Sequence, residues 1–298
     1  RVIPLYKSGD ASLLSNYRPV SVLPAMSKIL ERLMYNRLLS FINSNGIIYN
    51  YQFGFRESHS PNLAMILLVD KISNALENGE YVLGLFLDFS KAFDTVNHEI
   101  LFKKLEFYGV RGVALQWFHS YFFRREQYVE FEGTQSSRDY ILCGVPQGSI
   151  LGPLLFLLYI NDLANVSTVI FSLLFADDSN MFLSGKCPDE LINIMNTEII
   201  KILDWLALNK LSLNVSKTHF MFFRRKRSKI MVKSNLIIKG EIIDMVEQTK
   251  FLGIVIDSSL TFLAHIQYIK GKIARGLGII CKARKYFLKR TLMTLYNA

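Results

Sequence analysis

Cysteine is scarce in this sequence, and it has no long apolar run. The 298 residues include three cysteines, Cys143, Cys187 and Cys281, and their spacing forms no metal-binding pair. This spacing excludes a zinc cluster, and the scarcity suggests a reducing compartment. The longest apolar stretch, residues 150–160, has about half of the roughly 20 residues that a membrane span requires. With no membrane span and no signal peptide, we expect an intracellular protein that does not act at a membrane.

Acidic residues are absent from residues 258–298, which carry eight Lys and Arg. From residue 205 onward, 18 Lys and Arg stand against 4 Asp and Glu, a net charge of +14, whereas the first 204 residues carry 17 against 21, a net charge of −4. All of the surplus positive charge therefore lies in the last third of the chain. Such a surface would attract a polyanion and release counterions on binding, which favours nucleic acid. A solvated basic surface and an interface with an acidic partner are the alternatives.

Composition and length indicate a folded protein with a sizeable core. Hydrophobic residues make up 50% of the chain and charged residues 20%, which does not resemble a disordered sequence. A chain of 298 residues predicts two or three subdomains. It starts at Arg1 in an apparent strand and stops inside an apparent helix, and we expect it to be a piece of a longer polypeptide.

The spacing of apolar residues predicts helices interleaved with strands. The predicted helices cover residues 26–42, 62–78, 97–109, 113–123, 149–163 and 189–206, with basic helices closing the chain. The predicted strands lie near residues 3–7, 83–88, 128–131, 140–143, 169–174, 180–183, 219–223, 236–238, 242–243 and 251–256. Because most of these strands are joined as hairpins, we predict an α+β fold with helices on one face of an antiparallel sheet.

Three carboxylates follow predicted strands. Asp177 and Asp178 lie at the tip of a predicted hairpin, and Asp88 ends an earlier apolar strand. Like charges a few ångströms apart repel, so such a cluster calls for bound divalent cations, and two magnesium ions at such a site usually serve phosphoryl transfer. We expect Asp88 and Asp177 to be metal ligands, with Asp178 one step further away. An isolated Asp-Asp pair can also merely cap a turn.

Two further segments suit a nucleotide site. Phe93 lies five residues after Asp88, where its ring could lie under a sugar and exclude a 2′-hydroxyl; it could equally be a core residue at a helix start. Residues 144–148 (GVPQG) place Gln147 between two glycines, which allow close approach of the backbone to a ligand. As an ordinary turn, this segment alone would be unremarkable.

Taken together, the motifs resemble those of reverse transcriptases, and within them the non-LTR, LINE-like retrotransposon enzymes of the jockey type. The resemblance spans nearly the whole chain, and its blocks follow the family order. They are residues 17–21 (YRPVS), 27–31 (SKILE), 52–56 (QFGFR), 88–94 (DFSKAFD), 144–149 (GVPQGS) with 152–153 (GP), 175–178 (FADD) and 251–253 (FLG). One departure is Phe175, where many reverse transcriptases have Tyr; Phe also occurs there in LINE-like relatives.

The resemblance implies a right-hand polymerase fold. Residues 1–80 would form the fingers, residues 81–256 the palm with some inserted finger elements, and residues 257–298 the start of a basic helical thumb. It also implies roles for single residues. Asp88, Asp177 and Asp178 would bind two Mg²⁺ ions, with Mn²⁺ as a substitute, Phe93 would be the sugar gate, and Gln147 with Gly148 would contact the nucleotide.

The remaining roles implied by the resemblance concern phosphate and primer. Lys7 and Arg18 would hold the triphosphate, with Arg56 a weaker third candidate. Lys217 matches a lysine proposed to protonate the leaving pyrophosphate, although an exposed lysine is the simpler interpretation. Phe251, Leu252 and Gly253 would form the primer grip.

The resemblance predicts an RNA-directed DNA polymerase that adds deoxynucleotides to a primer 3′-hydroxyl on an RNA template. Its expected partners are an RNA template, a DNA primer or target, and deoxynucleoside triphosphates, in a ribonucleoprotein of the nucleus and cytoplasm. One alternative is a decayed or domesticated RNA-binding derivative without polymerase activity, against which the three intact acids argue. A group II intron-type or telomerase-type polymerase is the other; residues 97–99 and 151–153 fit the LINE-like pattern better.

Overall fold

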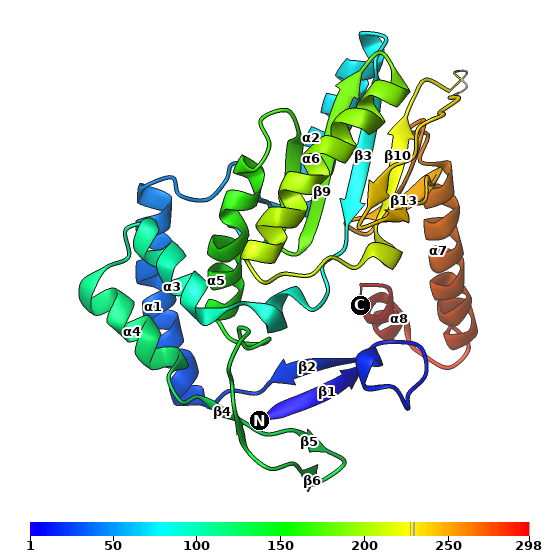
Figure 1. Ribbon diagram of the computed structural model, residues 1–298. Coiled ribbons are helices and arrows are strands. Elements are labelled where there is room, and N and C mark those ends of the chain that lie inside the picture. The colour runs from blue at the N-terminus through cyan, green and yellow to red at the C-terminus, as the bar shows by residue number, and fades with distance from the viewer. Residues whose placement is uncertain (227, 229, 298) are drawn as a thin grey trace.

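The computed structural model describes residues 1–226, 228 and 230–297 of the chain (Figure 1). Its centre is a four-stranded antiparallel sheet with the strand order β10–β3–β9–β8. The strands of this sheet are β3 (Tyr81–Leu87), β8 (Phe171–Phe175), β9 (Asp178–Gly185) and β10 (His219–Phe223). Strands from three distant parts of the sequence therefore meet side by side.

The described part of the chain also contains eight α-helices. They are α1 (Ala25–Ser44), α2 (Pro61–Glu77), α3 (His98–Phe107), α4 (Gly112–Phe122), α5 (Leu151–Ile160), α6 (Pro188–Leu208), α7 (Leu263–Ala283) and α8 (Lys289–Asn297). All six helices predicted by position are confirmed, with small shifts at their ends. Two begin at a residue type that commonly caps helices: Asn97 Oδ1 accepts a hydrogen bond from Ile100 N at 3.1 Å, and Ser60 Oγ accepts one from Leu63 N at 3.2 Å.

Helices cover both faces of the sheet. Because side chains alternate along a strand, Leu85 of β3 enters a larger core under α5 and α6, and its neighbour Phe86 enters a smaller core under α2. Figure 1 shows α6 and α2 on opposite sides of the sheet. The expectation that helices cover one face was therefore incomplete. Both faces of β3 are apolar, and each needs cover from water.

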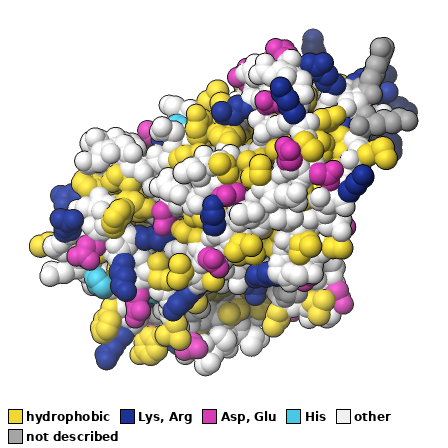
Figure 2. Space-filling model, turned by 45° about the horizontal axis from the view of Figure 1, so that its top comes forward, with side chains coloured by type: hydrophobic (Ala, Val, Ile, Leu, Met, Phe, Trp, Pro, Cys, Tyr) yellow, Lys and Arg dark blue, Asp and Glu magenta, His cyan; other side chains and the backbone are white. Residues whose placement is uncertain are grey.

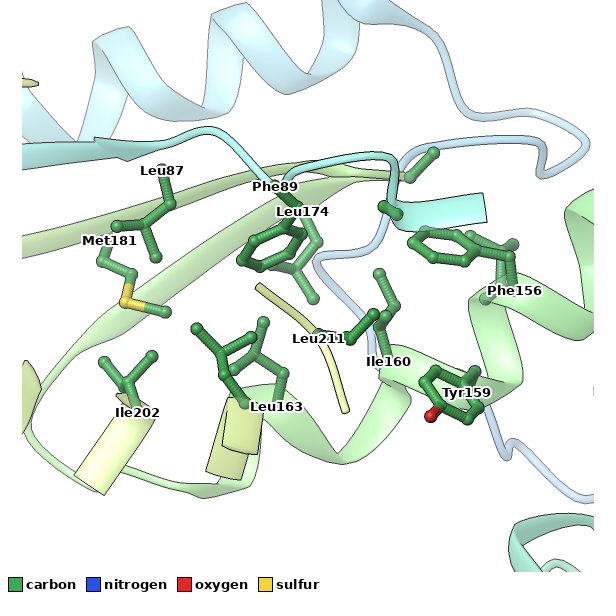
Figure 3. Packing of buried hydrophobic residues seen from close by; sticks show 14 of the residues in the cluster. Leu87, Phe89, Phe156, Tyr159, Ile160, Leu163, Leu174, Met181, Ile202 and Leu211 are labelled. Carbon is green, nitrogen blue, oxygen red and sulfur yellow. The ribbon is translucent and has the colours of Figure 1, made fainter. Parts of the chain in front are cut away.

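The apolar run near residues 150–160 forms α5, which lies at the centre of the larger core. Nine of its 10 residues are buried. Figure 3 shows Phe156 and Tyr159 projecting from α5, while Phe89, just past β3, lies against Leu174 of β8. A helix that is apolar all round is buried on all sides, and here the protein supplies that environment. In the part of the chain that the structure describes, no helix is long and apolar enough to cross a membrane.

Short two-stranded antiparallel sheets lie at the periphery of the molecule. They pair β1 (Val2–Tyr6) with β2 (Tyr17–Ser21), β4 (Glu126–Gln127) with β7 (Asp139–Tyr140), β5 (Glu130–Phe131) with β6 (Thr134–Gln135), β11 (Ile237–Ile238) with β12 (Glu241–Ile242), and β13 (Gln248–Phe251) with β14 (Ile254–Asp257). The single strand predicted over residues 251–256 was wrong. Leu252 and Gly253 form a two-residue turn with φ angles of +46° and +89°, which is typical of a tight hairpin.

The basic C-terminal helices are present as predicted. α7 runs beside the β13–β14 hairpin, and none of the described residues of α7 or α8 is buried. On the face of the molecule drawn in Figure 2, Lys and Arg side chains lie among acidic and hydrophobic ones. On that face, positive charges are therefore interspersed with other side chains.

Candidate active site

A cleft of about 1160 Å³ opens at the end of the central sheet, where the β1–β2 hairpin, the segment after β3 and the loop before α5 meet. It collects most of the residues that the sequence singled out. Those lining it are Lys7, Arg18, Asp88, Phe93, Gln147, Gly148, Asp177 and Lys217. These residues come from five segments that are far apart in the chain, so the cleft is a product of the tertiary structure.

The register of the sheet brings the two acids that line the cleft to the same end. Leu87 pairs with Ser179 across β3 and β9, so Asp88 follows β3 at the edge where Asp177 precedes β9. Phe175 pairs with Asp178, which leaves Ala176 and Asp177 as the two turn residues of the predicted hairpin. The hairpin is confirmed, and Asp177 lies at its tip.

A buried glutamine outside the sheet holds this tip. Gln52 Oε1 accepts hydrogen bonds from Gly54 N at 2.9 Å and from Ala176 N at 3.0 Å, and the Gln52 side chain is 2% exposed. Phe53 N also donates to Leu174 O at 2.8 Å, so this segment runs alongside β8. The sequence marked residues 52–56 only as a family block, and the role of Gln52 was missed.

The carboxylates at the tip resist ionisation. Burial, together with the charges of Asp177 and Asp88, raises the pKa of Asp178 to about 6. Burial also raises the pKa of Asp177, and Asp88 adds to this, while the charges of Arg18 and Lys7 oppose it. Solvent still reaches both side chains, so desolvation is partial. The charge of Asp88 therefore acts on both carboxylates at the tip, and the charge of Asp177 acts on Asp178.

The donor chemistry of these acids fits a divalent cation, because Mg²⁺ prefers carboxylate oxygens. Within residues 1–226, 228 and 230–297, however, no three His, Cys, Asp or Glu side chains form a cluster that could hold a metal ion. Asp88 Oδ2 instead lies 3.9 Å from Lys217 Nζ. This ion pair places a positive charge beside Asp88. The ligand roles of Asp88, Asp177 and Asp178 stay predictions.

Aromatic packing fixes the ring of Phe93 in the cleft. The ring stacks on Phe156 of α5, with centroids 4.2 Å apart and planes inclined by 24°, and it forms a T-shaped pair with Phe55, with centroids 6.3 Å apart. Phe156 is fully buried, so it offers a firm support for the ring. Phe93 is half-buried and presents its remaining surface to the cleft.

The loop that carries Gln147 is attached to its surroundings by backbone hydrogen bonds. Gly144 N donates to Val96 O at 2.7 Å, Val145 N donates to Phe93 O at 2.8 Å, and Ser21 N donates to Gln147 O at 2.7 Å. Gly148 has a φ of +105°, and a Cβ there would lie 2.7 Å from Ser21 O. Glycine is therefore required at this close approach between the loop and β2.

The cations of the cleft come from opposite walls. Lys7 follows β1, and Arg18 lies on β2 opposite Leu5, whereas Lys217 ends the 3₁₀ helix of residues 215–217. All three side chains are exposed. Asp94, Lys91 and Asn214 also line the cleft, and the sequence assigned none of them a role. Asp94 and Lys91 belong to the 88–94 block, which was the available signal.

Some residues that the sequence singled out lie outside this cleft. Asp178 begins β9 beside it, and the hairpin turn of residues 251–253 lies apart from it, with Phe251 buried against Phe86. Arg56 turns inward, where its Nη1 donates to Tyr49 O and Gln52 O at 3.1 Å each. These contacts give Arg56 a structural role behind the hairpin tip.

Comparison with known proteins gives the family. A family model described as reverse transcriptase (RNA-dependent DNA polymerase) matches residues 6–256. The probable RNA-directed DNA polymerase from transposon X-element of Drosophila melanogaster is 30% identical over 294 residues, covering 95% of this chain and 32% of the relative. The RNA-directed DNA polymerase from mobile element jockey of Drosophila funebris is 31% identical, covering 89% of this chain and 29% of the relative. The chain spans about a third of the length of these curated relatives.

A solved structure supports the fold. The telomerase from Candida tropicalis, in complex with a fragment of telomeric RNA, aligns with a TM-score of 0.51 and 14% identity, covering 80% of this chain and 37% of that chain. At this identity the likeness concerns the fold alone. The predicted α+β right-hand polymerase fold and the predicted resemblance to jockey-type elements are confirmed. Because the family model matches most of this chain, the chain belongs to the reverse transcriptase family.

Proposed function

We propose that this chain carries the RNA-directed DNA polymerase activity of a non-LTR retrotransposon. It would add deoxynucleotides to the 3′-hydroxyl of a DNA primer that is paired with an RNA template. The observation that carries the proposal is the cleft, in which two strand-end acids share one space with several cations and an aromatic ring. Membership of the family supports the same reaction.

Asp88, Asp177 and Asp178 would hold two magnesium ions, with manganese as a substitute; when bound, these ions supply Lewis-acid activation of the primer hydroxyl and charge for the leaving phosphate. The residues of the chain contribute the placement. β3 and β9 bring the first two acids to one edge, and Gln52 fixes the backbone beside Asp177. The pKa of Asp178 is raised mainly by burial and further by the charges of Asp177 and Asp88, and a nearby cation would offset the contribution of these charges, which supports the proposal.

Lys7 and Arg18 would neutralise the triphosphate of the incoming nucleotide. Their charges already act on Asp177, so a phosphate bound between them and the acids would lie close to the reacting centre. In the reaction, the primer 3′-hydroxyl loses its proton to water and its oxygen forms a bond to the α-phosphorus, while the bond from the α-phosphorus to the pyrophosphate oxygen breaks. Lys217, near Asp88, would give a proton to the departing pyrophosphate.

Phe93 would exclude ribonucleotides. Its ring is held by Phe156 beneath and Phe55 at its edge, so it cannot easily move aside for a 2′-hydroxyl. We expect Phe93→Ala to raise ribonucleotide incorporation about tenfold relative to deoxynucleotides, since removing the ring opens space for the hydroxyl. Single-nucleotide incorporation with matched ribo- and deoxynucleotides measures this ratio, and an unchanged ratio would remove the gate role.

The division into fingers (1–80), palm (81–256) and thumb start (257–298) belongs to this proposal. The exposed basic residues of α7 and α8 would bind the backbone of the primer–template duplex. The β13–β14 turn at residues 251–253 would act as the primer grip. Its position beside α7 supports a surface shared with the thumb.

Primer extension on an RNA template tests the proposal. Purified wild-type protein should extend a DNA primer with Mg²⁺ and lose this activity with a chelator. Asp177→Asn should reduce extension at least a thousandfold, because it removes a charged ligand oxygen from the reacting centre. Asp204→Asn, at an exposed site on α6, is the matched control and should extend normally. RNA binding without any extension by the wild type would favour the non-catalytic RNA-binding derivative instead.

A further inference from the structure

Asp94 is a cleft residue for which the sequence suggested no role. It lies in the 3₁₀ helix Ala92–Thr95, directly after Phe93, and it lines the cleft. Gln147 Nε2 donates a hydrogen bond to Asp94 Oδ1 at 2.8 Å. Both side chains are half-buried, so the bond is partly shielded from water. The pair joins the two segments that the proposed function assigns to the nucleotide.

The chemistry of this bond sets the orientation of an amide. A glutamine side chain can turn its amide by 180° with almost no change in shape, which exchanges the carbonyl oxygen with the NH₂ group. An ionised carboxylate can only accept hydrogen bonds, so its partner must be the NH₂ group. While Asp94 is present, the orientation that keeps the bond leaves Gln147 Oε1 free to accept from another donor.

The backbone holds both partners in place. Val145 N donates to Phe93 O at 2.8 Å, and Gly144 N donates to Val96 O at 2.7 Å, which brackets Asp94 on both sides. A Cβ at Gly144 would lie 2.7 Å from Asp94 O, so the loop approaches the Asp94 backbone as closely as glycine allows. The side-chain bond therefore forms between two segments whose separation is already fixed.

Neighbouring cations favour the ionised carboxylate. Burial raises the pKa of Asp94, whereas the hydrogen bond from Gln147 and the charges of Lys91 and Arg18 lower it. Both cations line the same cleft. Burial has the larger effect, so the pKa of Asp94 lies above its ordinary value, while Lys91, Arg18 and the hydrogen bond from Gln147 favour the ionised form. When it is ionised, Asp94 can only accept hydrogen bonds.

We propose that Asp94 is a positioning residue for nucleotide binding, which fixes the Gln147 amide so that its carbonyl oxygen accepts a hydrogen bond from the incoming nucleoside triphosphate. This inference rests on the proposed polymerase function. Asp94 acts on the nucleotide through Gln147, so the two residues should contribute to nucleotide binding as a unit.

A double-mutant cycle tests this coupling. Asp94→Leu removes the acceptor, Gln147→Leu removes the amide, and the double variant removes both. KM and kcat are measured for single-nucleotide addition on an RNA template, and thermal unfolding midpoints are recorded for every variant. We expect each single variant to raise KM for the nucleotide about tenfold, with kcat changed less than threefold. The double variant should raise KM no further than either single variant.

Asp94→Asn provides the conservative rescue. Asparagine keeps a carbonyl oxygen that can accept from the Gln147 NH₂ group, so its KM should stay within about threefold of the wild type. Asp204→Leu, on the exposed face of α6, is the control for loss of an acid and should leave KM unchanged.

The possible outcomes distinguish a failure of this inference from a failure of the proposed polymerase function. If the wild type extends primers but the effects of Asp94→Leu and Gln147→Leu on KM multiply, the coupling is absent and the inference fails alone. If Asp94→Asn raises KM as much as Asp94→Leu does, at equal unfolding midpoints, then Asp94 has a purely electrostatic role. This result would also overturn the inference. If the wild type fails to extend, the proposed function itself falls.

Discussion

Two hairpins of this protein have turns of the same length but are stabilised in different ways. The β8–β9 turn consists of Ala176 and Asp177, and the β13–β14 turn of Leu252 and Gly253. Ala176 has a φ of +54°, an unfavourable value for a residue with a side chain, whereas the second turn has a glycine at one of its two left-handed positions. Both turns therefore hold one residue with a side chain at positive φ, but only the second turn also contains a glycine, the residue that favours such a turn.

Contacts from outside the hairpin explain the difference. Gln52 accepts from the Ala176 backbone, and Gly54 packs directly against Ala176, so distant residues hold the β8–β9 tip. Around Gly253, by contrast, a Cβ would meet nothing within 4 Å among the described residues. A turn that carries an acid into a cleft needs rigid support, and here the support comes from a segment 124 positions away.

The largest expected effect comes from removing that support. Gln52→Leu leaves the buried N–H groups of Gly54 and Ala176 without their acceptor, and it should lower the free energy of unfolding by about 4 kcal/mol. The comparison variant is Thr249→Val in β13, which removes one hydrogen bond to His219 and should cost about 1 kcal/mol. Urea denaturation measures both. Equal losses would contradict the distinction between the two hairpins.

A smaller difference in the free energy of unfolding is expected between two glycine substitutions, one at Gly54, which packs against the β8–β9 turn, and one at Gly253, within the β13–β14 turn. Gly54→Ala places a Cβ into the Ala176 backbone nitrogen, and it should cost about 3 kcal/mol because backbone must move. Gly253→Ala meets open space and costs about 1 kcal/mol, for its left-handed conformation alone. Thermal and chemical denaturation of the two variants give the ranking, and a greater loss in Gly253→Ala would reverse our interpretation.

The smallest effect is on the pH dependence of folding stability, to which the two hairpins contribute with opposite sign. The pKa of Asp178 is raised to about 6, so the folded state binds an extra proton between about pH 4 and 6 and loses stability as the pH rises through that window. Burial opposes ionisation of Asp257, which ends β14, but hydrogen bonds from Thr261, Phe262 and Ser259 outweigh it and lower its pKa. Stability from Asp257 is therefore present above its ordinary pKa and lost on acidification.

Two asparagine variants expose these opposite slopes. Without divalent cations, Asp178→Asn should remove the decline in stability between about pH 4 and 6. Asp257→Asn should be destabilised at neutral pH, and its difference from the wild type should shrink as the pH falls below about 4. Urea denaturation from acid to neutral pH records both curves. The comparison fails if the two variants change the slope in the same direction.

Much of the fold followed from local patterns. The helix of residues 189–206 was recognisable because its apolar residues form one stripe, and the hairpin at Asp177 because two apolar runs flank a polar pair. The β13–β14 hairpin was missed because Leu252 and Gly253 lie within the run of residues 251–256, which resembles the interior of a single strand. Cover on both sheet faces was missed because periodicity does not say which helix lies on which side.

The candidate site shows the same limits. Residue type and motif order singled out Asp88, Asp177, Phe93 and Gln147, and the structure brings all four into one cleft. Arg56 was chosen for its charge, but its guanidinium donates to backbone carbonyls behind the cleft. Charge alone cannot separate a ligand-binding arginine from a structural one, because the difference lies in where the side chain points.

The sequence by itself determined which residues are candidates for the chemistry, since acids, cations, aromatic rings and glycines are recognisable from residue type and from their order in the motifs. Only the tertiary structure decided how these residues support one another. Gln52 reaches Ala176 across 124 positions, and Gln147 reaches Asp94 across 53. Such pairings depend on how the sheet register and loop contacts bring distant segments together, which no local pattern of residues encodes.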